Sequence, residues 1–149
     1  MAVTASVGRY NWMRVVDVMT TDPLTVTPTE TIGQADELMN TNRIRQLPVV
    51  EGKELVGIVT DRDIRSFLSG SLLEDPEARE KALNTKVSEI MTTEPITVSP
   101  EDDLEEVVEL LIEEKFGGIP VVDKSAGLVG IVTYMDVLQC FWNRLQEDY

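Results

Sequence analysis

Histidine is absent from the 149 residues, and cysteine occurs once, as Cys140. Histidine is the commonest general base and metal ligand near neutral pH, so its absence argues against a triad hydrolase or a zinc enzyme. A single cysteine excludes an internal disulfide and a cysteine-rich metal site. Cys140 lies in an apolar stretch, which predicts a buried, inert thiol. We therefore expect no catalytic residue, no catalytic cofactor and no metal.

Aromatic residues and long apolar runs are also scarce. Aromatics make up 5% of the chain, so its core is expected to be aliphatic. No apolar run approaches the roughly 20 residues that span a bilayer. Residues 1–14 lack the apolar segment of a secretory signal, which favours a cytoplasmic protein. The net charge of −14 disfavours nucleic acid and membrane surfaces as partners, but not a small anionic ligand.

The chain contains an internal duplication. The recurring segments are 15–28 with 87–100, 47–50 with 119–122, and 55–60 with 128–133. The first two pairs share an offset of 72 residues (87 − 15 = 72), and one inserted residue precedes the third. Such an ordered match predicts two copies of one structural unit.

Each copy predicts the element order β-α-β-β-α, which is an α/β (α+β) fold. A short first strand is centred on 24–26 or 96–98. A hydroxyl residue, a proline and an acid at 27–30 and 99–102 predict helix starts. Aliphatic runs then predict a β-hairpin whose strands are buried on both faces. A final helix is expected from about Asp61 to Phe67, and from about Tyr134 to Leu145 in the second copy.

The predicted organisation has four parts. They are an N-terminal extension (1–14), a first repeat (15–68), a linker with a short helix starting near 74–77 (69–86), and a second repeat with a longer final helix (87–149). The acidic segment 101–114 is interpreted as a solvated helix face.

These residues resemble the cystathionine β-synthase (CBS) domain family over about Val15 to Leu138. The marks are Met-Thr before the first strand, a Pro-Val-Val strand, and Gly-Ile-Val-Thr-x-x-Asp at the last strand-to-helix junction, all present twice. Among stand-alone pairs, the sequence is similar to the acetoin-utilisation regulatory proteins through Ile-Arg-x-Leu-Pro-Val-Val at 44–50 and Thr-Asp-Arg-Asp at 60–63.

The resemblance implies a pseudo-twofold pair of repeats with ligand clefts between them. The ligands that it implies are adenine nucleotides (AMP, ADP or ATP), with S-adenosylmethionine or NAD as alternatives. It also implies a homodimer, which the apolar stripe Leu138, Phe141, Trp142 and Leu145 supports. An unidentified regulated protein is a further expected partner.

The junction at Thr60 and Asp63 is the first candidate site. A hydroxyl and a carboxylate three residues apart lie on one side of a helix start, where the carboxylate could accept from two ribose hydroxyls. The alternative is a purely structural capping box. Recurrence as Thr133 and Asp136 favours ribose binding.

Cationic residues distinguish the two copies. Arg43, Arg45 and Arg62 could contact phosphate oxygens, and the second repeat has no arginine at the matching positions. The first site is therefore expected to prefer a phosphorylated ligand. Second-rank candidates, which family members place along the cleft, are Thr20, Thr25, Thr92 and Thr97. The alternative function is a ligand-free module that regulates a partner directly.

Overall fold

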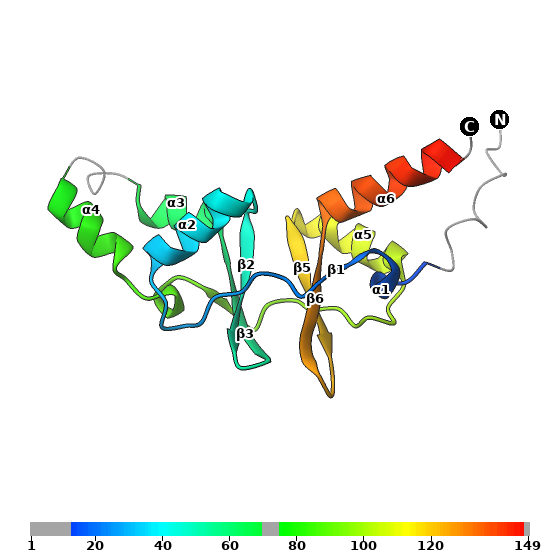
Figure 1. The fold of residues 1–149 in the computed structure, drawn as a ribbon, viewed down its shortest axis with the longest axis horizontal. Helices are drawn as coiled ribbons and strands as arrows, with labels where there is room; N and C mark the ends of the chain where they lie inside the picture. The colour runs from blue at the N-terminus through cyan, green and yellow to red at the C-terminus, as the bar shows by residue number, and fades with distance from the viewer. Residues whose placement is uncertain (1–12, 70–74, 148–149) are drawn as a thin grey trace. The chain divides into compact units, whose positions relative to one another are not determined.

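The computed structural model describes residues 13–69 and 75–147, so most of the predicted extension 1–14 lies outside the described residues. The chain divides into two compact units (Figure 1). One, the continuous unit, is Pro23–Pro95. The other, the discontinuous unit, combines the segment that ends at Asp22 with the segment that begins at Ile96.

Within the described residues, the continuous unit contains four helical elements and three strands. They are α2 (Ile32–Asn42), β2 (Gln46–Glu51), β3 (Glu54–Thr60), α3 (Asp61–Phe67), α4 (Pro76–Leu83), the 3-10 helix η2 (Val87–Glu89) and β4 (Thr92–Thr93). Isolated bridges join Val26 to Val49 and Thr31 to Lys86. The sheet order is β2-β3-β4, and all its strand pairs are antiparallel.

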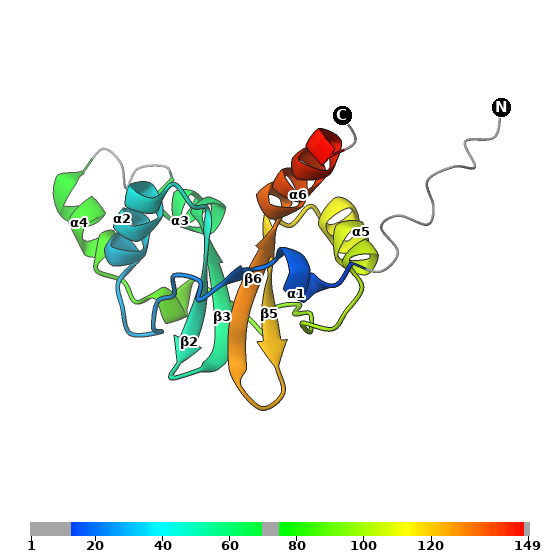
Figure 2. The same ribbon diagram turned by 45° about the vertical axis from the view of Figure 1, so that its right-hand side comes forward.

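The discontinuous unit repeats this plan with elements from both ends of the chain. They are α1 (Val15–Val18), β1 (Thr20–Thr21), α5 (Leu104–Glu114), β5 (Gly118–Asp123), β6 (Gly127–Thr133) and α6 (Tyr134–Glu147). The sheet order is β1-β6-β5, again antiparallel. Figure 2 shows β1 beside β6, with α5 and α6 next to the same hairpin.

The two repeats therefore exchange β1 and β4, the short strands nearest their starts, which are called the first strands below. Thr20 and Thr21 begin the first repeat but pair with Ile131 and Gly130 of the second. Thr93 begins the second repeat but pairs with Gly57 of the first. Each three-stranded sheet is completed by a segment from the other repeat, an exchange that local sequence patterns did not predict.

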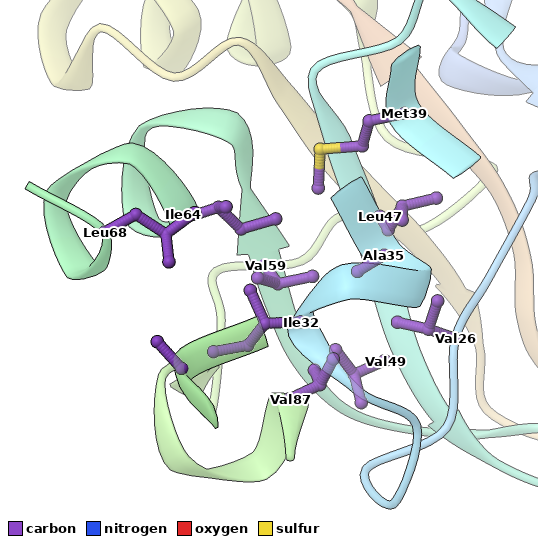
Figure 3. Packing of buried hydrophobic residues seen from close by; sticks show 11 residues of the cluster. Val26, Ile32, Ala35, Met39, Leu47, Val49, Val59, Ile64, Leu68 and Val87 are labelled. Atoms are coloured by element: carbon purple, nitrogen blue, oxygen red, sulfur yellow. The ribbon is translucent and has the colours of Figure 1, made fainter. Parts of the chain in front are cut away.

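The core of the continuous unit is aliphatic, as expected. Ile32, Ala35 and Met39 on α2 are buried at helical spacing, because these positions share one face of the helix. They pack with Leu47 and Val59 from the hairpin. Figure 3 shows these side chains converging from α2, β2 and β3.

The discontinuous unit has the matching core. Leu104, Val107 and Leu111 on α5 are buried with Ile119 and Val132 from β5 and β6. Cys140 is half-buried against this cluster rather than fully buried as predicted, with its Sγ atom 4.0 Å from Sδ of Met13.

The predicted helix starts at 27–30 and 99–102 are wrong. α2 begins at Ile32, after a capping box between Thr31 and Gln34, and α5 begins at Leu104. Residues 27–30 instead form a turn, and the N–H of Val87 donates to the Glu30 carbonyl oxygen at 2.8 Å. Because this carbonyl is already paired with a distant donor, it does not accept a helical hydrogen bond.

Two strand predictions also need correction. The expected first strands at 24–26 and 96–98 contribute only single parallel bridges, Val26 to Val49 and Val98 to Val121. Burial on both faces holds for β2, in which 47–50 are all buried, but not for β3, in which only Gly57 and Val59 are buried. The N–H of Val26 donates to the Pro48 carbonyl, and the N–H of Val50 donates to the Val26 carbonyl. The segment around Val26 is therefore hydrogen-bonded to β2 without forming an extended strand.

Candidate functional site

The strand-to-helix junction of the continuous unit, here called the first corner, is formed by Thr60 and Asp63. β3 ends at Thr60, which is extended (φ −116°, ψ 160°), and α3 begins at the next residue. The N–H of Asp63 donates to Thr60 Oγ1 at 3.1 Å, and the N–H of Thr60 donates to Asp63 Oδ2 at 2.9 Å. This capping box satisfies two N–H groups at the start of the helix and fixes both side chains.

The first corner keeps hydrogen-bonding capacity. Within the described residues, Asp63 Oδ1 accepts no hydrogen bond, and the Thr60 hydroxyl donates none. An ionised carboxylate offers about four acceptor positions, of which this one uses a single position. Both side chains are only half-buried. The first corner can therefore accept from two neighbouring hydroxyl groups of a ligand and donate to it as well.

The second corner, Thr133 and Asp136 at the junction of β6 and α6, is more fully engaged. The N–H of Thr133 donates to Asp136 Oδ2 at 2.8 Å, and the Thr133 hydroxyl donates to the same oxygen at 3.0 Å. The N–H of Asp136 donates back to Thr133 Oγ1 at 3.1 Å. The Thr20 hydroxyl then donates to Asp136 Oδ1 at 2.9 Å. Three donors thus converge on this carboxylate.

The predicted arginines lie in the continuous unit and are exposed. Arg43 ends α2 in the left-handed conformation (φ 55°), and the carbonyl of Arg45 accepts from the N–H of Asp61 at 2.8 Å. That bond ties Arg45 to the start of α3, on which Arg62 lies. Within the described part of the chain, none of the three guanidinium groups has an ion-pair partner.

Arg65, the other arginine of α3, is a surface residue. It is exposed and pairs with Asp61 at 2.9 Å, one helical turn earlier. In the discontinuous unit, Lys115 takes the left-handed position that ends α5, and Tyr134 and Met135 begin α6. Cationic side chains are therefore concentrated in the continuous unit.

The second-rank threonines divide between the two units. Thr20, on β1, reaches the second corner, and Thr92, on β4, lies beside Ile58 in the sheet of the first corner. Thr25 and Thr97 each precede a single-residue bridge, in the continuous and the discontinuous unit respectively. The structure thus brings Thr20 to Asp136 but joins neither Thr25 nor Thr97 to a corner by a side-chain hydrogen bond among the described residues.

Met19 and Met91, which come directly before Thr20 and Thr92, pack against glycines of the neighbouring strands. A Cβ atom added at Gly57 would lie 2.8 Å from Met91 Sδ and 2.8 Å from the Thr92 carbonyl oxygen. At Gly130 the same distances separate it from Met19 Sδ and the Thr20 carbonyl oxygen. Glycine permits such a close approach, because it has no Cβ atom. The approaching segment could be found only from the Met-Thr pair that precedes each first strand.

The described residues offer little for other chemistries. In residues 13–69 and 75–147, no group of three or more Cys, Asp or Glu side chains is arranged to hold a metal ion. In the same ranges, no helix is both long and apolar enough to cross a bilayer. In the β5–β6 turn, the N–H of Ser125, with its hydroxyl and the N–H of Ala126, lowers the pKa of the Asp123 carboxyl group.

Curated proteins with similar sequences include enzymes. The chain is 40% identical over 116 residues to inosine-5'-monophosphate dehydrogenase of Korarchaeum cryptofilum, covering 78% of this chain and 22% of that protein. It is 34% identical over 133 residues to the uncharacterized protein MJ1225 of Methanocaldococcus jannaschii, covering 84% of this chain and 48% of that one. The chain therefore spans less than half the length of both relatives.

Solved structures match over nearly the whole chain. A putative acetoin utilization protein (AcuB) from Vibrio cholerae has a TM-score of 0.78 and 34% identity, covering 92% of this chain and 97% of that one. CBSX2 in complex with AMP has a TM-score of 0.74 and 31% identity, covering 91% and 98%. The CBS domain pair of MJ0100, in complex with 5'-methylthioadenosine and S-adenosyl-L-methionine, has a TM-score of 0.72 and 28% identity, covering 89% and 98%.

The sequence of this chain matches the CBS domain family twice, over residues 15–70 and 87–143. These two matches include both corners and both exchanged first strands. Together with the similarity to solved CBS pairs, they establish that the chain belongs to the CBS domain family, of which it carries two copies.

Proposed function

We propose that this chain is a non-catalytic regulatory module that binds an adenine nucleotide, AMP, ADP or ATP, through its two corners. The observation that carries the proposal is the first corner, where Asp63 Oδ1 and the Thr60 hydroxyl proton have no partner among the described residues. A carboxylate fixed in this way matches the neighbouring 2'- and 3'-hydroxyls of a ribose.

The exposed arginines support a phosphorylated ligand at the first corner. Arg45 is tied to the start of α3 through its carbonyl, and Arg62 lies on α3 itself. Guanidinium groups without an ion-pair partner can form charge-assisted hydrogen bonds to phosphate oxygens. Arg43 ends α2 in the same unit and is the third candidate donor. The second corner, which lacks such arginines, would accept an adenosine derivative less tightly.

The ligands of two structural neighbours favour the same class. CBSX2 is similar over 91% of this chain and was solved with AMP. The CBS pair of MJ0100 was solved with 5'-methylthioadenosine and S-adenosyl-L-methionine. All three molecules share an adenosine moiety, so ribose recognition by the corner is compatible with each. S-adenosylmethionine is accordingly the alternative ligand.

Calorimetric titration of AMP into the wild type, Asp63→Ala and the matched variant Asp136→Ala tests the proposal. Loss of one or two hydrogen bonds to a charged group should weaken AMP binding by roughly ten- to a hundredfold in Asp63→Ala. Asp136→Ala should have a smaller effect. Circular dichroism would establish that both variants fold. Unchanged AMP affinity in Asp63→Ala would overturn the assignment.

The phosphate assignment has its own measurement in the same titrations. Arg62→Ala should weaken the binding of AMP and leave the binding of adenosine unchanged, because adenosine carries no phosphate. Arg65→Ala is the control, since Arg65 already pairs with Asp61. An equal loss for both ligands would show that Arg62 acts on the fold or the base rather than on phosphate.

A ligand-free interaction module is the second candidate, and one observation favours it. Both corners are complete capping boxes, so Thr60, Asp63, Thr133 and Asp136 have a structural role without any ligand. A thermal-shift screen separates the two functions, because a ligand that binds the folded state raises the unfolding temperature. No response to AMP, ADP, ATP or S-adenosylmethionine would favour the interaction module.

We further propose a cytoplasmic homodimer that acts on a partner protein. Leu138, Phe141 and Trp142 are each more than half exposed on α6, and Leu145 is half-buried. A second copy would remove this apolar surface from water.

A further inference from the structure

The hydroxyl of Thr20 lies at the second corner. It donates to Asp136 Oδ1 at 2.9 Å, across 116 residues of sequence. We propose that Thr20 is a specificity-determining residue that competes with a ligand hydroxyl for Asp136 and thereby makes the second corner the weaker site. This inference rests on the proposed function, because it concerns how the same two corners divide the ligand.

The hydrogen bonds of the two carboxylates support this difference. Asp136 accepts three, from the N–H and hydroxyl of Thr133 and from the hydroxyl of Thr20. Asp63 accepts one, from the N–H of Thr60. Of about four acceptor positions on a carboxylate, one remains at Asp136 and three at Asp63. Only Asp63 can accept from two ribose hydroxyls without losing an existing partner.

The backbone does not explain the difference. Thr20 pairs with Ile131, and the matching Thr92 pairs with the matching Ile58, so β1 and β4 have the same register on their sheets. Met19 and Met91 contact Gly130 and Gly57 in the same way. Yet among the described residues Thr92 makes no side-chain hydrogen bond to Asp63. The corners differ in two hydroxyls: those of Thr20 and Thr133 donate to Asp136, whereas among the described residues the matching hydroxyls of Thr92 and Thr60 do not donate to Asp63.

The expected effect is moderate. Thr20 is exposed, so when a ligand displaces its hydroxyl from Asp136, water replaces the lost partner. The free-energy cost of displacing Thr20 is therefore the net free energy of one solvent-accessible hydrogen bond. Its removal should tighten ligand binding at the second corner by roughly three- to tenfold.

The test uses the Asp63→Ala variant, in which AMP binding reports on the second corner. AMP affinity is measured by calorimetry in this variant alone and with Thr20→Val, Thr20→Ser or Thr21→Val added. Valine keeps the shape of threonine and removes its hydroxyl, whereas serine keeps the hydroxyl. Thr21→Val makes the same change one position along β1, where the hydroxyl has no hydrogen bond among the described residues.

Tighter AMP binding with Thr20→Val, and unchanged binding with Thr20→Ser and Thr21→Val, is the expected result. Equal or weaker binding with Thr20→Val would overturn the inference, since the hydroxyl would then be neutral or would assist the ligand. If the wild type binds AMP through Asp63 but Thr20→Val brings no gain, the inference fails and the proposed function stands. If Asp63→Ala leaves AMP binding intact while Thr20→Val tightens it, the assignment of the first corner fails and the inference stands.

Discussion

The continuous and discontinuous units share a sheet plan, a core plan and a capping box, but differ around the carboxylate. In the continuous unit, Asp63 has one donor and exposed arginines lie nearby in the fold. In the discontinuous unit, Asp136 has three donors and the helix starts with Tyr134 and Met135. The two copies thus share the Thr/Asp capping box and differ in the residues around it.

The helices that follow the corners differ most, and this difference gives the largest expected effect. α3 buries Ile64 and has no large hydrophobic residue exposed, whereas α6 exposes Phe141 and Trp142 by 53% and 57%. Replacing both aromatic residues by serine should raise the dissociation constant of the dimer by roughly a hundredfold or more. Sedimentation equilibrium would measure it.

Gln146→Ser serves as the control for that experiment, because Gln146 is an exposed polar residue on the same helix. Its dissociation constant should equal that of the wild type. A wild-type protein that sediments as a monomer at all concentrations would contradict the proposed dimer.

Gly57 and Gly130, which lie against β4 and β1, test a feature that the two units share. Gly57→Ala and Gly130→Ala each place a methyl group 2.8 Å from a methionine sulfur and from a backbone carbonyl oxygen. Because the backbone must move, each change should lower the free energy of unfolding by about 1–3 kcal/mol. Urea titrations followed by circular dichroism would measure both costs. A large cost in one variant alone would show that β1 and β4 are held differently.

The hairpin turns give the smallest expected effect. Asp123 accepts from the N–H and hydroxyl of Ser125, both at 2.8 Å, and these bonds hold its pKa below the ordinary value of 3.8. A carboxyl group with a lowered pKa in the folded state stabilises that state above its unfolded pKa. This contribution is lost as pH falls through the folded pKa.

Asp123→Asn should therefore lower the melting temperature slightly at pH 7, and the difference from wild type should shrink as pH falls below 3.8. Glu51→Gln, at the matching position of the other hairpin, is the matched variant, because Glu51 accepts no side-chain hydrogen bond among the described residues. A difference for Asp123→Asn that persists unchanged into acid would exclude the charge as its cause.

Local patterns predicted much of this architecture. The strand-to-helix junction after β3 placed α3 at Asp61–Phe67, and the Asp-Pro pair at 75–76 placed the start of α4. These features depend on neighbours within one turn, so the sequence contains the information. The capping interpretation of Thr60 and Asp63 is also present in the structure, and ribose binding remains a prediction.

Prediction from the sequence was wrong or incomplete where a group's hydrogen-bond partner lies far away along the chain. The pattern at 27–30 resembles a helix start, but the carbonyl of Glu30 pairs with Val87, which no local window includes. In the same way, nothing near Thr20 indicates that its hydroxyl reaches Asp136. The hydroxyl donors of Asp136 are set by the assembled sheet and junction, so a difference between the two corners could be predicted only from the cationic residues.

The exchange of first strands also dictates an order of events as the chain is made. β4 must be synthesised before the sheet that begins with β2 and β3 is complete. β1 is made early, yet its pairing partner Ile131 follows Thr20 by 111 residues (131 − 20 = 111). Such a contact closes a long loop and forms slowly. Until the second hairpin emerges from the ribosome, β6, the strand on which β1 pairs in the folded protein, does not exist.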